Sequence, residues 1–172
     1  MKFKTTLRSL VFTLSSLVSV AVPAVEVNFT ANLIQNPPCD VSGPDGVNQP
    51  IRVPFGDVGI TKINGVNYRQ DFTITLSCGA GLGNAVAVYL EYRGMIAPFD
   101  ENALQASPLG LGIRLYQNGN VVPPNTGIPV NMSGNDPKEL QFYAVTVKDT
   151  SPASTLYEGD FTATASMELN YP

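Results

Sequence analysis

The chain has 172 residues, of which ten are Lys or Arg, fourteen are Asp or Glu, two are Cys and none is His. This length suits one domain with its own core. The acidic balance and the lack of any Lys/Arg cluster exclude nucleic acid as an expected partner. Without His or a spare thiol, the sequence offers little to catalysis or metal binding, so we expect no enzyme, cofactor or small-molecule substrate.

The first 24 residues have the pattern of a secretory signal peptide. An uncharged apolar stretch, Leu10–Val22, is followed by small residues that end at Ala24, which is where we place the cleavage; Ala21 is the alternative site. Cleavage after Ala24 leaves 148 residues with seven basic and fourteen acidic side chains, a formal charge of about −7. The basic residues of the leader are Lys2, Lys4 and Arg8.

Behind this leader, Val25–Leu33 alternates apolar and polar residues, as a strand with one buried face does. Pro37 and Pro38 then separate the stretch from the rest of the chain. It could be an ordinary edge strand of its own domain, but the proline break favours a strand that reaches outward. Export also makes a Cys39–Cys78 disulfide the expected pairing, because two thiols in an oxidising compartment usually join.

The middle of the chain shows short strand-like runs between Gly, Pro, Asn and Asp turns, and no long helical periodicity. We expect a short helical turn around Glu101–Gln105, inside an irregular stretch from Met95 to Pro108. Such spacing predicts an all-β sandwich, and the simplest immunoglobulin-like one has about seven strands. The predicted strands are Ile51–Val58, Tyr68–Cys78, Ala85–Tyr92, Leu111–Gln117, Glu139–Lys148 and Asp160–Tyr171.

The last predicted strand alternates as regularly as the first stretch and is followed only by Pro172. A spare strand at the front and an unfinished edge at the back suggest a subunit that completes its neighbour. The C-terminal segment Gly159–Pro172 also resembles the terminal β-motif of chaperone–usher pilins, with Gly159 fourteen positions from the end and Tyr171 as the penultimate aromatic. Asn36–Cys39 and Gly112–Tyr116 are similar to segments of the minor subunits of P-type and type 1 fimbriae.

That resemblance implies an incomplete immunoglobulin-like sandwich that lacks its last strand, with an N-terminal donor-strand extension. It implies a signal peptide at 1–24, an extension at 25–36 and a pilin domain at 37–172. The implied donor side chains are Val25, Val27, Phe29, Ala31 and Leu33, with Ala31 where many members have Gly. The implied groove and chaperone-binding residues are Gly159, Phe161, Ala163, Ala165, Met167, Leu169, Tyr171 and Pro172.

The partners implied are a periplasmic pilus chaperone, an outer-membrane usher and neighbouring pilin subunits, and the implied location is a fimbrium on the bacterial surface, reached through the periplasm. The expected function is that of a minor or adaptor subunit of an adhesive fimbria, polymerised by donor-strand exchange. Two alternatives stay open: a major rod pilin, and a self-contained secreted β-sandwich that binds carbohydrate, although the chain has no Trp to stack on a sugar.

Overall fold

The computed structural model describes residue 29 and the ranges 38–80 and 86–171. The chain divides into two units, Met1–Ile34 and Gln35–Pro172, and the second holds every described residue except Phe29. The predicted signal peptide therefore lies outside the described residues. In the described ranges, no helix is long and apolar enough to cross a membrane.

The second unit is all-β, as predicted, and its larger sheet has seven antiparallel strands in the order β1-β2-β9-β6-β5-β4, with β7 paired to β6. The Asn118–Gly119 turn joins β6 to β7 with positive φ at both residues (49° and 80°), as this dipeptide predicts. The strands are β1 Cys39–Ser42, β2 Gln70–Cys78, β4 Ile96–Ala97, β5 Asp100–Gln105, β6 Leu111–Gln117, β7 Asn120–Val122 and β9 Lys138–Lys148.

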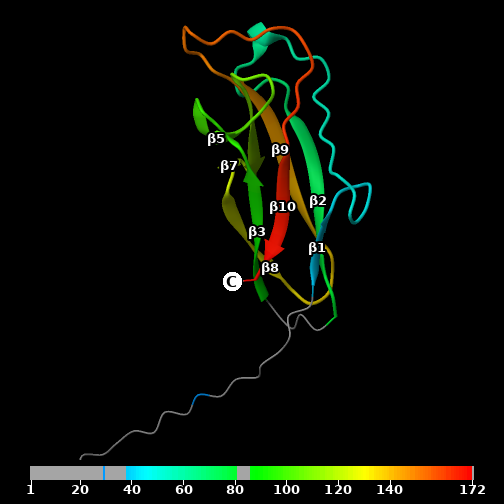
Figure 1. Ribbon diagram of the computed structural model, residues 1–172. Helices are drawn as coiled ribbons and strands as arrows, with labels where there is room; N and C mark the ends of the chain where they lie inside the picture. The colour runs from blue at the N-terminus through cyan, green and yellow to red at the C-terminus, as the bar shows by residue number, and fades with distance from the viewer. Residues whose placement is uncertain (1–28, 30–37, 81–85, 172) are drawn as a thin grey trace, which may run out of the picture. The chain divides into compact units, whose positions relative to one another are not determined.

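The smaller sheet has three antiparallel strands in the order β10-β3-β8, with β3 at Val86–Gly94, β8 at Thr126–Met132 and β10 at Ala165–Asn170. It lies over the larger sheet, so that β10 runs in front of β9 in Figure 1. A single 3-10 turn, η1 at Ile60–Lys62, stands at the upper end of this unit. The result is the two-layered, immunoglobulin-like sandwich that the sequence predicts.

Alternating residues from both sheets fill the space between the layers. The largest fully buried side chains come from β2, β3, β8 and β9, and each has less than 2% of its surface exposed. Because every second residue of these strands points inward, the period-two pattern of the sequence converts directly into the core. These side chains are Phe142, Ile74, Leu76, Leu90, Met132, Val88 and Thr146.

Three sequence predictions about the elements are wrong in detail. Residues 51–58 form no strand, because Pro54 has no N–H to donate and no described strand pairs with the segment. Residues 101–105 belong to β5 rather than to a helical turn, since Ala103 and Leu104 are buried and pair with β6. The last strand begins at Ala165 and not at Asp160. The sequence also did not predict β1, β4, β7 and β8.

Candidate functional site

The last strand of the sandwich has an open side. Among the described residues, β10 pairs with β3 alone, so its other edge presents backbone N–H and C=O groups without a neighbouring strand. Its inward side chains Met167, Leu169 and Tyr171 pack on the core yet are only partly buried. Their cross-strand neighbours on β3, such as Leu90 opposite Leu169, are almost completely buried. Within the described ranges, the side of β10 away from β3 is therefore open.

Residues 51–58 supply a second apolar row against the same core. Ile51, Val53 and Phe55 are partly buried and alternate with exposed Arg52 and Pro54. This is the pattern of a strand with one buried face, although the segment has no ladder. Sequence reasoning predicted a strand at residues 51–58 but did not connect it with the open edge of β10.

The second row also contacts an aromatic ring that lies just before β10 in the chain. The Phe55 and Phe161 rings stand 5.9 Å apart between centroids and are tilted by 51°, a favourable aromatic arrangement. Phe161 precedes β10 in the chain and also contacts the small cluster around Ile63 and Leu111. Both half-buried apolar rows thus pack against the same core cluster. One row lies on β10, which pairs with one described strand, and the other lies on residues 51–55, which pair with none.

The opposite end of β10 is fastened to the disulfide. Cys39 and Cys78 are bonded at 2.03 Å, which confirms the predicted pairing, and they face each other across β1 and β2. The Tyr171 hydroxyl lies 3.0 Å from the Cys39 sulfur, and burial raises the pKa of Tyr171. With a separation of 39 residues, the disulfide stabilises the fold by up to about 4 kcal/mol on the chain-entropy model.

The other predicted site residues are distributed unevenly. Ala163 and Ala165 are exposed, and so is Gly159 in the loop before β10. Phe29, the one donor position within the described residues, has an exposed side chain. The remaining positions, Val25, Val27, Ala31, Leu33 and Pro172, lie outside the described residues.

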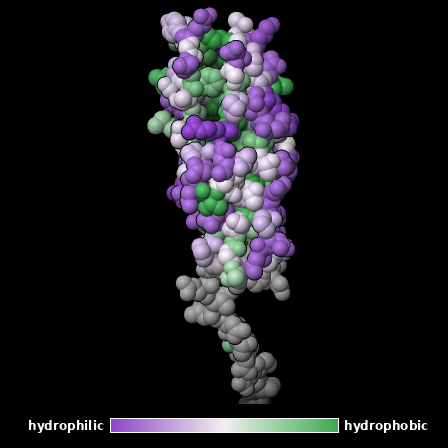
Figure 2. Space-filling model, turned by 90° about the vertical axis from the view of Figure 1, so that its right-hand side faces the viewer, coloured by the Kyte–Doolittle hydropathy of each residue, from purple (hydrophilic) through white to green (hydrophobic). Residues whose placement is uncertain are grey.

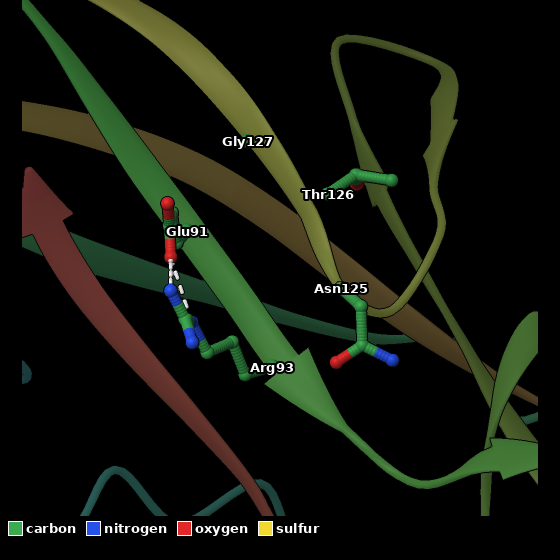
Figure 3. A pocket seen from close by; sticks show the side chains of 5 residues that line it. All are labelled: Glu91, Arg93, Asn125, Thr126 and Gly127. Carbon is green, nitrogen blue, oxygen red and sulfur yellow. Dashed lines mark hydrogen bonds and ion pairs between the residues drawn. The ribbon is translucent and has the colours of Figure 1, made fainter. Parts of the chain in front are cut away.

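A shallow depression lies on the outer face of the smaller sheet, beside β3 (Figure 3). Its charged groups neutralise each other, because Arg93 Nε donates to Glu91 Oε2 at 2.7 Å. Asn125 bonds both backbone groups of Gly94, at 3.2 and 3.1 Å. Arg93 and Glu91 therefore pair with each other, while Asn125 holds the turn before β8 against the end of β3. Within the described ranges, no group of three or more His, Cys, Asp or Glu is placed to hold a metal ion.

Comparison with known proteins agrees with this fold. The family model described as "Fimbrial protein" matches residues 25–172. The fimbrial-like protein YfcR of Escherichia coli (strain K12) is 31% identical over 140 residues, which cover 78% of this chain and 74% of that protein.

Two solved structures share the fold. The P pilus rod subunit PapA matches with a TM-score of 0.63 and 23% identity, over 78% of this chain and 99% of that one. The P pilus adaptor subunit PapF matches with a TM-score of 0.55 and 25% identity, over 80% and 98%. These neighbours are structural pilus subunits and not enzymes. The chain therefore belongs to the fimbrial protein family.

Proposed function

We propose that this pilin polymerises by donor-strand exchange, and that the open edge of β10 together with residues 51–58 is the groove that receives the donor. The single observation behind this proposal is the pair of half-buried apolar rows, Met167–Tyr171 and Ile51–Phe55, on backbone that no described strand pairs on that side. A strand laid between them would bury both rows and satisfy the β10 edge. Addition of an extended peptide to a free sheet edge is a known mode of recognition, and donor-strand complementation of pilins is its named example.

The donor in this proposal is residues 25–35 of a second copy or of a related subunit. The segment alternates, so Val25, Val27, Phe29, Ala31 and Leu33 lie on one face of an extended strand. Burying these side chains contributes on the order of 10 kcal/mol gross. Because a whole domain is stable by only about 5–15 kcal/mol, a subunit without the donor stays close to unfolding.

The low stability of a subunit without its donor explains what the proposed partners would do. An unpaired edge beside half-buried apolar side chains promotes aggregation, so a periplasmic chaperone would cover β10 and hold the Pro172 carboxylate until assembly. An outer-membrane usher would then exchange the chaperone strand for the donor. We place the protein in an adhesive fimbrium on the cell surface, as a minor or adaptor subunit. Gold-labelled antibody would test that position: sparse label at one point of each fibre supports it, and label along the whole length indicates a rod subunit.

The test of strand donation compares the melting temperatures of two chains. One is residues 36–172, and the other carries residues 25–35 after a flexible linker behind Pro172. We expect a large rise in melting temperature for the second chain. A matched control has the same linker and length but Val27→Ser and Phe29→Ser, and it should lose most of the rise. If residues 36–172 alone melt as high and stay monomeric, strand donation is refuted.

A further inference from the structure

One end of the sandwich exposes large apolar side chains. Met95, Leu109 and Tyr157 have relative exposures of 68%, 70% and 77%, and we call these three residues the end patch. They lie in the loops before β4, before β6 and before β10. In Figure 2 the hydrophobic colour also gathers toward the upper end of this unit, while the lower part is mostly hydrophilic.

The loops that carry the end patch are tied together by backbone contacts. Asp149 N donates to Gly110 O at 2.8 Å, so the turn after Leu109 is fastened to the start of the loop that carries Tyr157. A Cβ built on Gly110 would stand 3.5 Å from Leu156 Cδ2, which shows how closely the two loops approach. Gln105 N donates to Met95 O at 2.7 Å and joins the third loop to β5. The patch therefore stands on a fixed surface.

The end patch lies at the entry of β10 and not at its exit. Ser107 and Thr162 exchange two backbone hydrogen bonds, of 2.8 and 3.1 Å, which place the segment before β10 beside the Leu109 turn. The other end of β10 lies at Cys39, where the Tyr171 hydroxyl contacts the disulfide. The first strand, β1, begins at Cys39, so in this proposal a donor extension joins the domain at the end opposite to the end patch.

The direction of the donor strand now decides what covers the patch, and this step rests on the proposed function. Every described strand pair of the chain is antiparallel. A donor antiparallel to β10 runs from the Cys39 end toward the end patch. Only Asn36–Pro38 then separate residue 35 from Cys39 of the donor's own domain, and three extended residues span about 10 Å. Two domains joined by so short a segment must touch.

We propose that the end patch is a second contact surface between consecutive subunits, and that its occupant is the Cys39 end of the next copy. In that copy, exposed Pro38 continues directly from the donor segment, and its carbonyl accepts a hydrogen bond from Gly79 N at 3.0 Å. This end therefore arrives as an ordered surface. The contact removes Leu109 and Tyr157 from water and stiffens the joint, so that strand donation fixes the order of subunits and the end patch fixes the angle between them.

The test uses pairs of mature chains, residues 25–172, isolated as donor-linked dimers and compared with the chaperone-free single chain complemented by a peptide of residues 25–35. Amide hydrogen exchange follows residues 107–110 and 155–158. We expect these amides to exchange at least about tenfold more slowly in the dimer than in the peptide-filled single chain. Equal exchange rates in the two samples overturn the proposed contact at the end patch but leave the proposal of strand donation intact. If no dimer forms, both proposals fall.

A variant with Leu109→Ser and Tyr157→Ser provides a second readout. The dimer should still form, because the donor groove is unchanged, but the interdomain distance measured by paired spin labels should broaden. The matched control is Val47→Ser with Val121→Ser, which also removes two exposed hydrophobic side chains, of 46% and 38% exposure, away from the end patch. Distance distributions that are identical in the wild type, the variant and the control overturn the proposal.

Discussion

Strands β3 and β10 lie side by side in one sheet and differ in how completely they are buried. Both alternate apolar and polar residues, and their inward side chains face each other in register, Tyr92 opposite Met167 and Leu90 opposite Leu169. On β3 these side chains have 4% and 0% of their surface exposed, whereas on β10 they are only partly buried. The difference follows from neighbours: β3 has a strand on each side, and β10 has one.

This comparison shows that a side chain of the right type and orientation is not enough to complete a core. Leu169 points toward the same core as Leu90, yet part of its surface still meets water. Burial stabilises in proportion to the apolar area removed from water, so β10 makes a smaller contribution than its sequence allows. A donor strand would supply the rest of this stabilisation, because it would cover the surface of β10 that still meets water.

The largest expected effect comes from shortening the two facing leucines. Leu90→Ala should lower the free energy of unfolding by about 2–5 kcal/mol, as for other fully buried leucines. Leu169→Ala should cost only about 1–2 kcal/mol, because its surface is already partly in water. Urea unfolding of residues 36–172 measures both values.

The same two substitutions in the chain with residues 25–35 appended sharpen the comparison. The cost of Leu169→Ala should rise toward that of Leu90→Ala, whose own cost should change little. If the two substitutions already cost the same free energy of unfolding without the donor, then the difference in burial between β3 and β10 does not affect stability.

Two tyrosines extend the comparison to alkaline pH. Burial raises the pKa of Tyr92 to about 12, while the partly buried Tyr171 is shifted upward from its ordinary value for the same reason. Between pH 10 and 12 the unfolded chain then binds fewer protons at Tyr92 than the folded one, so stability is complete below pH 10 and falls as the pH rises. Because the pKa of Tyr92 is raised by about two units, the loss in the free energy of unfolding should reach roughly 3 kcal/mol.

Urea unfolding at pH 8, 10 and 11.5 measures this loss, and Tyr92→Phe should remove most of it. Tyr171→Phe is the matched variant on the edge strand and should change the alkaline slope less. An alkaline slope that Tyr92→Phe leaves unaltered would show that other groups, such as lysines, cause the loss.

The sequence predicted best the elements whose pairing is complete. Leu111–Gln117 was predicted with the bounds of β6, because Leu111, Ile113 and Leu115 alternate cleanly on one face. It did not predict β8, since Pro129 interrupts the strand pattern. The proline is exposed on an edge strand that, among the described residues, pairs only with β3, where the missing N–H is tolerated. In β5, local helix preference lost to the burial of Ala103 and Leu104.

Parts of the candidate site could also be predicted from the sequence, and other parts could not. The disulfide could be inferred from export of a chain with two cysteines, and the one-sided alternation of β10 could be inferred from residues within a few positions of one another. The second apolar row, Ile51, Val53 and Phe55, was visible as an alternation but not as a wall of the site. Its assignment depends on which strand is absent beside it, and a single chain does not encode its neighbour's position.

The smallest effect is expected on the outer face, where β3 and β10 should behave alike. Glu91 and Glu168 are opposite each other in register, and Glu91 accepts a hydrogen bond from Arg93. Like charges directly opposite repel, and exposed ion pairs contribute little, so Glu91→Gln and Glu168→Gln should each change stability by less than about 1 kcal/mol. Neither value should respond to the appended donor strand, because these side chains point away from the core. A donor-dependent change at Glu168 would mean that the donor reorganises the whole strand rather than covering one face, and the contrast between β3 and β10 would then lie in backbone order instead of side-chain burial.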